Sequence, residues 1–158
     1  MKLGDWFGHW GLGKIKLNIG FAEAEFELKP DDRAAAWDLY VEMLTRIVTQ
    51  PLPDEDGDEK TALDSVHSLF KTTRDILKAH GAHCVEFTKV AIVVLNQIVR
   101  PFTAKWHPLS LANAFADQSR RNEFRTELSA LQIDLRKYTR ALASMAQVED
   151  LTGLYAEE

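Results

Sequence analysis

The most apolar stretch of the chain, Val85 to Val99, predicts a buried helix at the centre of the protein. Its apolar residues recur at helical spacing, and Ile92, Val93 and Val99 extend the apolar surface over most of the circumference. A helix that is apolar nearly all round must be buried nearly all round. The stretch is too short and too interrupted by polar side chains to span a bilayer. We therefore expect the other long segments to pack around it.

Three further segments show the periodicity of amphipathic helices, over residues 31–50, 61–81 and 119–147. The last of them carries a heptad-like apolar seam, which suits packing at a shallow angle along a neighbouring helix. Long helices joined by short or moderate loops favour an up-and-down four-helix bundle, here over residues 30–148. The predicted fold class is therefore mostly α.

Two prolines are expected to shape the end of the central helix. Pro101 lacks an N–H group, and it should either kink the helix or begin a short extension through Trp106. The pair His107-Pro108 should then end that extension, because a proline disfavours helical geometry in the residue before it.

Residues 1–29 follow a different pattern, in which apolar and polar side chains alternate from 14 to 28. The phase of the alternation changes at Gly20, which predicts a β-hairpin with its turn there. The implied register places Lys16 opposite Glu23. It therefore pairs opposite charges across the strands and keeps the apolar side chains on one face. A single long strand with a bulge is the alternative. Because an isolated ribbon is marginally stable, it should pack on the helices or pair its edges with another chain.

The start of the chain, before residue 14, combines glycines with large aromatic side chains and is predicted to be an arm. Glycine disfavours a stable helix, whereas Trp6, Phe7 and Trp10 are unfavourable in water. The arm either folds over one end of the bundle or inserts as an anchor into a partner's groove. At the other end, residues 149–158 are expected to form a flexible tail on a chain that is a single domain.

Composition and charge narrow the class of protein. A length of 158 residues and a hydrophobic content of 46% fit one globular domain and argue against extensive disorder. The net charge of −5 disfavours nucleic-acid binding by bulk electrostatics, so nucleic acid is not an expected partner. The single cysteine, Cys84, forms no internal disulfide and fits a reducing cytosol. With no signal peptide and no membrane segment in the pattern, we expect a cytoplasmic protein without membrane contact.

One charge pattern is a candidate binding surface, and it lies on the last predicted helix. Four arginines project there within about one quadrant: Arg121, Arg125, Arg136 and Arg140. This arginine stripe is compatible with a solvated flank, with a surface for an acidic protein partner, or with a site for nucleotide or RNA phosphates. The absence of an aromatic side chain among the arginines weakens the nucleic-acid interpretation.

Two arginine–histidine pairs, Arg74 with His80 and Arg100 with His107, have five and six residues between their members. This spacing resembles the Arg-x(4–6)-His pattern of HEPN domains, which are helical bundles that often cleave RNA as dimers. The resemblance implies that His80 would transfer a proton while Arg74 stabilises phosphate charge. The alternative is that both side chains interact with the C-terminal dipole of their helix.

Two further clusters do not define a metal site. His80, His83 and Cys84 are close enough to share a metal, but no further ligand is evident in the sequence. Aspartates alternate over residues 54–58 at the spacing of a calcium-binding loop, without the glycine that such a loop requires. We therefore expect no metal and no cofactor.

These patterns favour a non-enzymatic helical interaction or regulatory subunit, for example in a bacterial multi-gene system. Its contacts with another protein or a second copy would use the hairpin edge, the aromatic arm or the arginine stripe. The first alternative is a HEPN-like RNA-cleaving or nucleotide-modifying toxin that uses Arg74 and His80. The second is a sensor of phosphate or nucleotide ligands that uses the arginine stripe.

Overall fold

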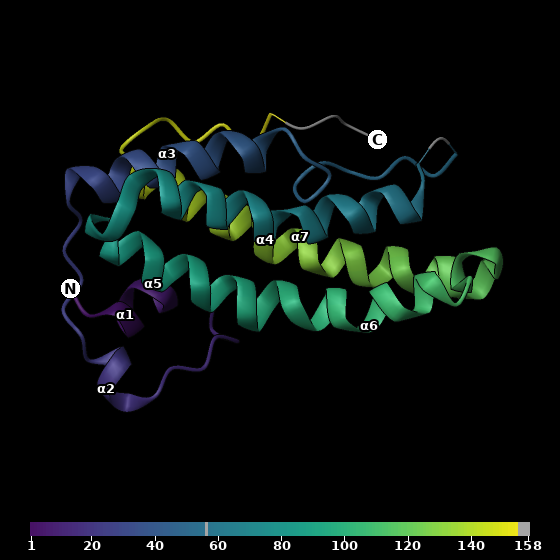
Figure 1. The fold of residues 1–158 in the computed structure, drawn as a ribbon, viewed down its shortest axis with the longest axis horizontal. Helices are drawn as coiled ribbons and strands as arrows, with labels where there is room; N and C mark the ends of the chain where they lie inside the picture. The colour runs from purple at the N-terminus through teal and green to yellow at the C-terminus, as the bar shows by residue number, and fades with distance from the viewer. Residues whose placement is uncertain (56, 155–158) are drawn as a thin grey trace.

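Long helices make up most of the chain in the computed structural model, which describes residues 1–55 and 57–154 (Figure 1). The mostly helical fold class is confirmed. The long helices are α3 (Pro30–Leu44), α4 (Glu59–His80), α5 (Val85–Val94), α6 (Arg100–Leu111) and α7 (Gln118–Ala146). Short 3-10 turns at Gly81–His83 and Ala114–Ala116 connect them. Asp56 and the end of the predicted tail, residues 155–158, lie outside the described residues.

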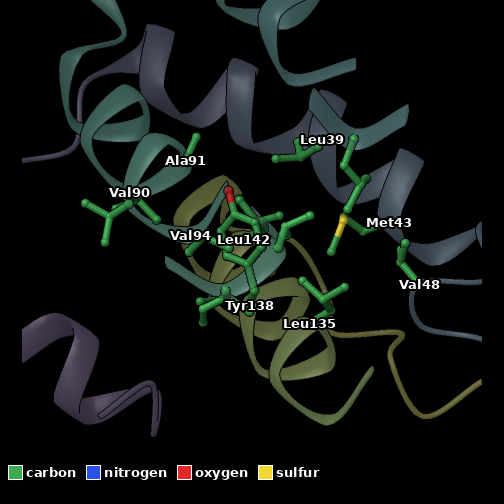
Figure 2. Close-up of a cluster of buried hydrophobic side chains, with 14 of the residues drawn as sticks. Leu39, Met43, Val48, Val90, Ala91, Val94, Leu135, Tyr138 and Leu142 are labelled. Atoms are coloured by element: carbon green, nitrogen blue, oxygen red, sulfur yellow. The ribbon is translucent and has the colours of Figure 1, made fainter. Parts of the chain in front are cut away.

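Figure 1 shows that α5 and α6 continue in the same direction, and that α3, α4, this α5–α6 segment and α7 lie side by side with alternating directions. Helix α3 packs against α4, α5 and α7, while α6 packs against α4 and α7. Figure 2 shows the core between α3, α5 and α7, to which α3 contributes Leu39 and Met43. No helix among the described residues is long and apolar enough to cross a membrane.

The predicted central helix is present, but it is not buried all round. Phe87, Val90 and Val94 are fully buried, as the apolar pattern predicts. Val85 and Ile92, however, are 44% and 45% exposed. They lie seven residues apart, which is two helical turns, so they share one face of α5. That face also carries Lys89 four residues after Val85, a polar signal that marks its solvent side.

A π-helical turn, Leu95–Val99, joins α5 to α6. In a regular α-helix the ring of Pro101 would clash with the carbonyl of Gln97, four residues earlier. The wider π-helical turn lies at this position, so α5 and α6 continue as one rod through Pro101. The prediction that His107-Pro108 ends the helix is wrong, because α6 continues to Leu111 with Pro108 inside it.

The first long helix is shorter than predicted, because α3 ends at Leu44 rather than at residue 50. Side chains from the following segment take up the last carbonyls of the helix. The Thr49 hydroxyl donates to the Met43 carbonyl at 2.6 Å, and the Gln50 amide donates to the Leu44 carbonyl at 3.1 Å. These bonds replace the continuation of the helix.

The predicted β-hairpin, and the single long strand offered as its alternative, are both wrong. The described residues form no strand, and their one β contact is an isolated antiparallel bridge between Lys2 and Glu25. Residues 19–22 form a short helix, α2 (Ile19–Ala22), instead of a turn. The side chain of Gln97 bonds both backbone groups of Lys16, accepting from its N–H at 2.6 Å and donating to its carbonyl at 2.7 Å. One glutamine thus supplies the pairing that a second strand would have given.

The N-terminal arm is a helix, α1 (Leu3–His9), despite its glycines. Leu3, Trp6 and Phe7 lie at helical spacing and are all buried. The Trp6 ring packs against Phe26 with centroids 5.2 Å apart. Burial of such side chains outweighs the low helix propensity of glycine, which is about 1 kcal/mol per residue.

The described part of the tail lies against α3 (Figure 1). The buried Tyr40 hydroxyl donates to the Glu149 carbonyl at 2.9 Å and accepts from the Leu151 N–H at 2.8 Å. Tyr40 thus joins α3 to the tail at Glu149 and Leu151.

Candidate functional site

Two members of the arginine stripe hold the segment between α3 and α4. Arg125 donates to Glu59 at 3.0 Å and to the Pro53 and Gly57 carbonyls, both at 3.0 Å. Arg136 donates to the Thr49 carbonyl at 3.0 Å. These guanidinium groups satisfy backbone carbonyls of an irregular segment, which is a structural role.

The other two arginines of the stripe differ from each other. Arg121 donates to the Phe115 carbonyl at 2.7 Å and so fixes the 3-10 turn that precedes α7. Arg140 is exposed. The four arginines therefore do not converge on one ligand site, because three of them are directed to separate backbone carbonyls.

The aromatic residues of the arm are largely occupied within the chain. Trp6 and Phe7 are 5% and 3% exposed. Trp10 is half-buried and packs at the edge of the core, with its ring centroid 6.4 Å from that of Trp6. This placement corresponds to the arm that folds over the helices, and it leaves Trp10 as the member with most access to solvent.

Arg74 and His80 are directed to different surroundings. His80 Nε2 lies 2.6 Å from Asp38 Oδ2 of α3. Arg74 lines a shallow groove along α4 with His67 and Lys71. Six residues on a helix correspond to about 240° of rotation, so the two side chains leave α4 on different faces. The structure does not bring this pair together.

The groups considered as metal ligands do not converge either. Among the described residues no cluster of three or more histidine, cysteine, aspartate or glutamate side chains is able to hold a metal ion. Cys84 is buried, with its thiol 3.2 Å from the Gly81 carbonyl. The calcium-loop interpretation of residues 54–58 depends on Asp56, which lies outside the described residues.

An apolar groove between α2 and α5 is the candidate interaction site, and the sequence pattern did not indicate it. The groove has a volume of about 370 Å³. Its lining residues are Phe21, Ala82, Val85, Thr88, Lys89, Ile92 and Val93. On α2, Ile19 is 83% exposed and is not a lining residue. We call this feature the α2–α5 groove.

The α2–α5 groove is formed by two elements that the sequence pattern misassigned. Its α5 wall was expected to be buried, and its α2 wall was expected to be a hairpin turn. Asn18 begins α2, because its side chain accepts from the Phe21 N–H at 2.9 Å. At the rim, Lys89 Nζ lies 3.0 Å from Glu86 Oε1, and this ion pair borders an otherwise apolar surface.

The fold defines the class of protein as a mostly helical chain, and an apolar groove lies on its surface. In comparisons with known proteins, no family model, no curated protein and no solved structure matches the chain.

Proposed function

We propose that this chain is a non-enzymatic helical interaction subunit that binds an amphipathic helix of another protein in the α2–α5 groove. The observation that carries the proposal is the exposure of Val85 and Ile92 on one face of α5, at 44% and 45%. Exposed apolar surface stabilises a complex by about 25 cal/mol per Å² when it is buried. A cluster of such side chains beside a groove is a common sign of a protein contact.

The dimensions of the groove suit a helical partner. Val85 and Ile92 are two turns apart, a rise of about 10 Å. A partner helix presents its anchor side chains at positions i, i+3 or i+4, and i+7, which span the same length. The charged pair of Lys89 and Glu86 at the rim then orients polar residues that flank the partner's apolar face.

The scaffold of this site is, in our proposal, an up-and-down four-helix bundle in which α5, the π turn and α6 act as one rod. The alternating helix directions in Figure 1 support this topology. We place the protein in the cytoplasm on the basis of its free Cys84.

The earlier alternatives gain no support from the contacts. RNA cleavage would require Arg74 and His80 to act together, and they leave α4 on different faces. Phosphate sensing by the arginine stripe would require free guanidinium groups, and three of the four are directed to backbone carbonyls.

The test compares the tagged full chain with Ile92→Glu and a matched control, Ile133→Glu. Ile133 is 53% exposed on α7 and is not a lining residue of the groove. Each form is purified from cells that naturally express the protein, and co-purifying proteins are quantified by mass spectrometry. Circular dichroism checks that both variants fold.

The proposal predicts one protein recovered with the wild type and with Ile133→Glu, and reduced at least about tenfold with Ile92→Glu. That loss corresponds to about 1.4 kcal/mol, within the range expected for burying one isoleucine. Equal recovery with all three forms, or loss with both variants, would contradict the α2–α5 groove as the contact surface.

A further inference from the structure

A pair of stacked histidines lies where α4 packs on α6. The rings of His67 and His107 have centroids 5.7 Å apart and planes inclined by 20°. Both residues are exposed. The two imidazoles therefore present ring nitrogens to solvent from two helices at nearly the same place. We call them the histidine pair.

Arginine side chains flank the histidine pair along the same helices. The Arg100 guanidinium lies over the Phe70 ring, 4.7 Å from its centroid, and its Nε donates to Asn96 at 3.1 Å. These contacts fix the cation against α4 without neutralising it. On α4, Arg74 lines a groove of about 470 Å³ together with His67. Among residues 1–55 and 57–154, no carboxylate lies within 4.0 Å of Arg74 or Arg100.

The other charged groups around the pair are already matched. In the groove, Lys71 pairs with Asp75 at 2.6 Å, and Asp64 pairs with Lys60 at 3.2 Å. From the α3 side, Arg46 donates to Ser68 at 2.6 Å, and its charge is balanced by Glu42 at 2.6 Å. The unmatched charge at this surface is therefore positive, although the chain as a whole carries a net charge of −5.

Protonation of the histidine pair increases this positive charge. Two imidazolium rings 5.7 Å apart repel each other, and the two arginines add to the repulsion. An anion that accepts a hydrogen bond from each ring removes this penalty. A phosphate group suits the position, because it has several acceptor oxygens and bears up to two negative charges.

We propose that the histidine pair, together with Arg74 and Arg100, binds the phosphate group of a ligand. This site is separate from the α2–α5 groove and does not depend on the function proposed for it. Binding strengthens as the pH falls, because a protonated imidazole carries a positive charge and donates from both ring nitrogens. The ligand is either a free phosphate compound or the phosphodiester backbone of RNA.

The test titrates the full chain with inorganic pyrophosphate and, separately, with a fluorescent ten-nucleotide single-stranded RNA. Calorimetry and fluorescence anisotropy measure affinity at about pH 6 and about pH 8. The variants are His67→Gln and His107→Gln, one on each helix, since glutamine keeps a polar side chain that does not become charged. His9→Gln is the matched control, because His9 is an exposed histidine on α1.

We expect pyrophosphate to bind the wild type and His9→Gln at least about tenfold more tightly than either pair variant at pH 6. RNA binding that pyrophosphate displaces would identify the backbone as a source of the phosphate, and pyrophosphate binding alone would identify a free compound. Absence of binding by both probes would overturn the proposal. Affinities unaffected by both substitutions, or equal at the two pH values, would overturn it as well.

Discussion

At the scale of single residues, three buried side-chain polar atoms of the described residues lack a hydrogen-bond partner, and one of them is the hydroxyl of Tyr138. Tyr138 is 3% exposed, and its hydroxyl makes no hydrogen bond among the described residues. Figure 2 shows the ring among apolar side chains of the core, near Val94 and Leu142. Burial raises the pKa of Tyr138, so the hydroxyl stays neutral but loses its bonds to water on folding.

Replacing Tyr138 by phenylalanine is therefore expected to be harmless or stabilising. The change removes an unsatisfied donor and keeps the ring, so the free energy of unfolding should stay equal or rise by up to about 1 kcal/mol. Urea denaturation measures this difference. A decrease of more than about 1 kcal/mol would contradict the placement of the hydroxyl, because it would reveal a hydrogen-bond partner.

Asp58 is a second residue whose chemistry makes a prediction, because it caps the N-terminus of α4. Its carboxylate accepts from the Thr61 hydroxyl at 2.5 Å and from the Thr61 N–H at 2.8 Å. Both bonds lower the pKa of Asp58, and the bond from the Thr61 hydroxyl has the larger effect. A lowered pKa in the folded state means that the stabilisation is present above the ordinary carboxyl range, about pH 4, and is lost as the pH falls.

We expect Asp58→Ala to lower the free energy of unfolding by about 1 kcal/mol at neutral pH. The difference from the wild type should shrink as the pH falls below about 4, because the wild-type carboxylate is then protonated. Denaturation of both proteins at several pH values measures this difference in the free energy of unfolding. A difference that stays the same at low and neutral pH would show that the carboxylate charge is not responsible.

At the scale of elements, α7 organises the irregular segment between α3 and α4. Besides the arginines, Gln132 of α7 donates to the Ile47 carbonyl at 2.6 Å and to the Gln50 carbonyl at 2.8 Å. Gln132 is 4% exposed, so these bonds lie away from water. Arg125, Arg136 and Gln132 thus belong to one set of contacts that fixes the shape of this connection.

Gln132→Leu should therefore destabilise the protein. It leaves two carbonyls without their donor, and the expected loss is about 2 kcal/mol in the free energy of unfolding. Hydrogen exchange should also become faster in residues 45–55 than elsewhere. Arg140→Ala, an exposed position on the same helix, is the control and should leave both quantities unchanged. An unchanged exchange rate in Gln132→Leu would refute the role assigned to α7.

The helical periodicity predicted the long elements well, and the second and last helices begin and end within about two residues of their predicted limits. It failed where side chains replace backbone pairing. Gln97 takes the place of a strand partner for Lys16, and Thr49 and Gln50 end α3 early. Such bonds join residues far apart in sequence or depend on the path of a loop, so no local pattern contains them.

The candidate site was missed for a related reason. Val85 and Ile92 were counted in an apolar stretch that was expected to be buried on all sides. Lys89 beside them was the available signal, since a charged residue between two apolar positions of one face marks that face as partly solvated. The depth of the groove depends on Phe21, and its position followed only from the true conformation of residues 19–22.

At the scale of the whole molecule, we propose that a surface on α5 binds a partner, whereas the aromatic arm packs within the chain. A subunit whose groove accepts a helix of another protein should not use that groove with itself. We therefore expect the purified chain to sediment as a monomer of 17.9 kDa. A dimer that Ile92→Glu dissociates, and Ile133→Glu does not, would instead identify a second copy as the occupant of the groove.

The most direct measurement of the central claim is site-specific photo-crosslinking in cells that naturally express the protein. A photo-reactive amino acid is placed at Val85 in the α2–α5 groove and, as the control, at Ile133 on α7. The account predicts a crosslink to one other protein from Val85, through a segment of that protein with helical periodicity, and none from Ile133. No crosslink from Val85, or the same products from both positions, would contradict it.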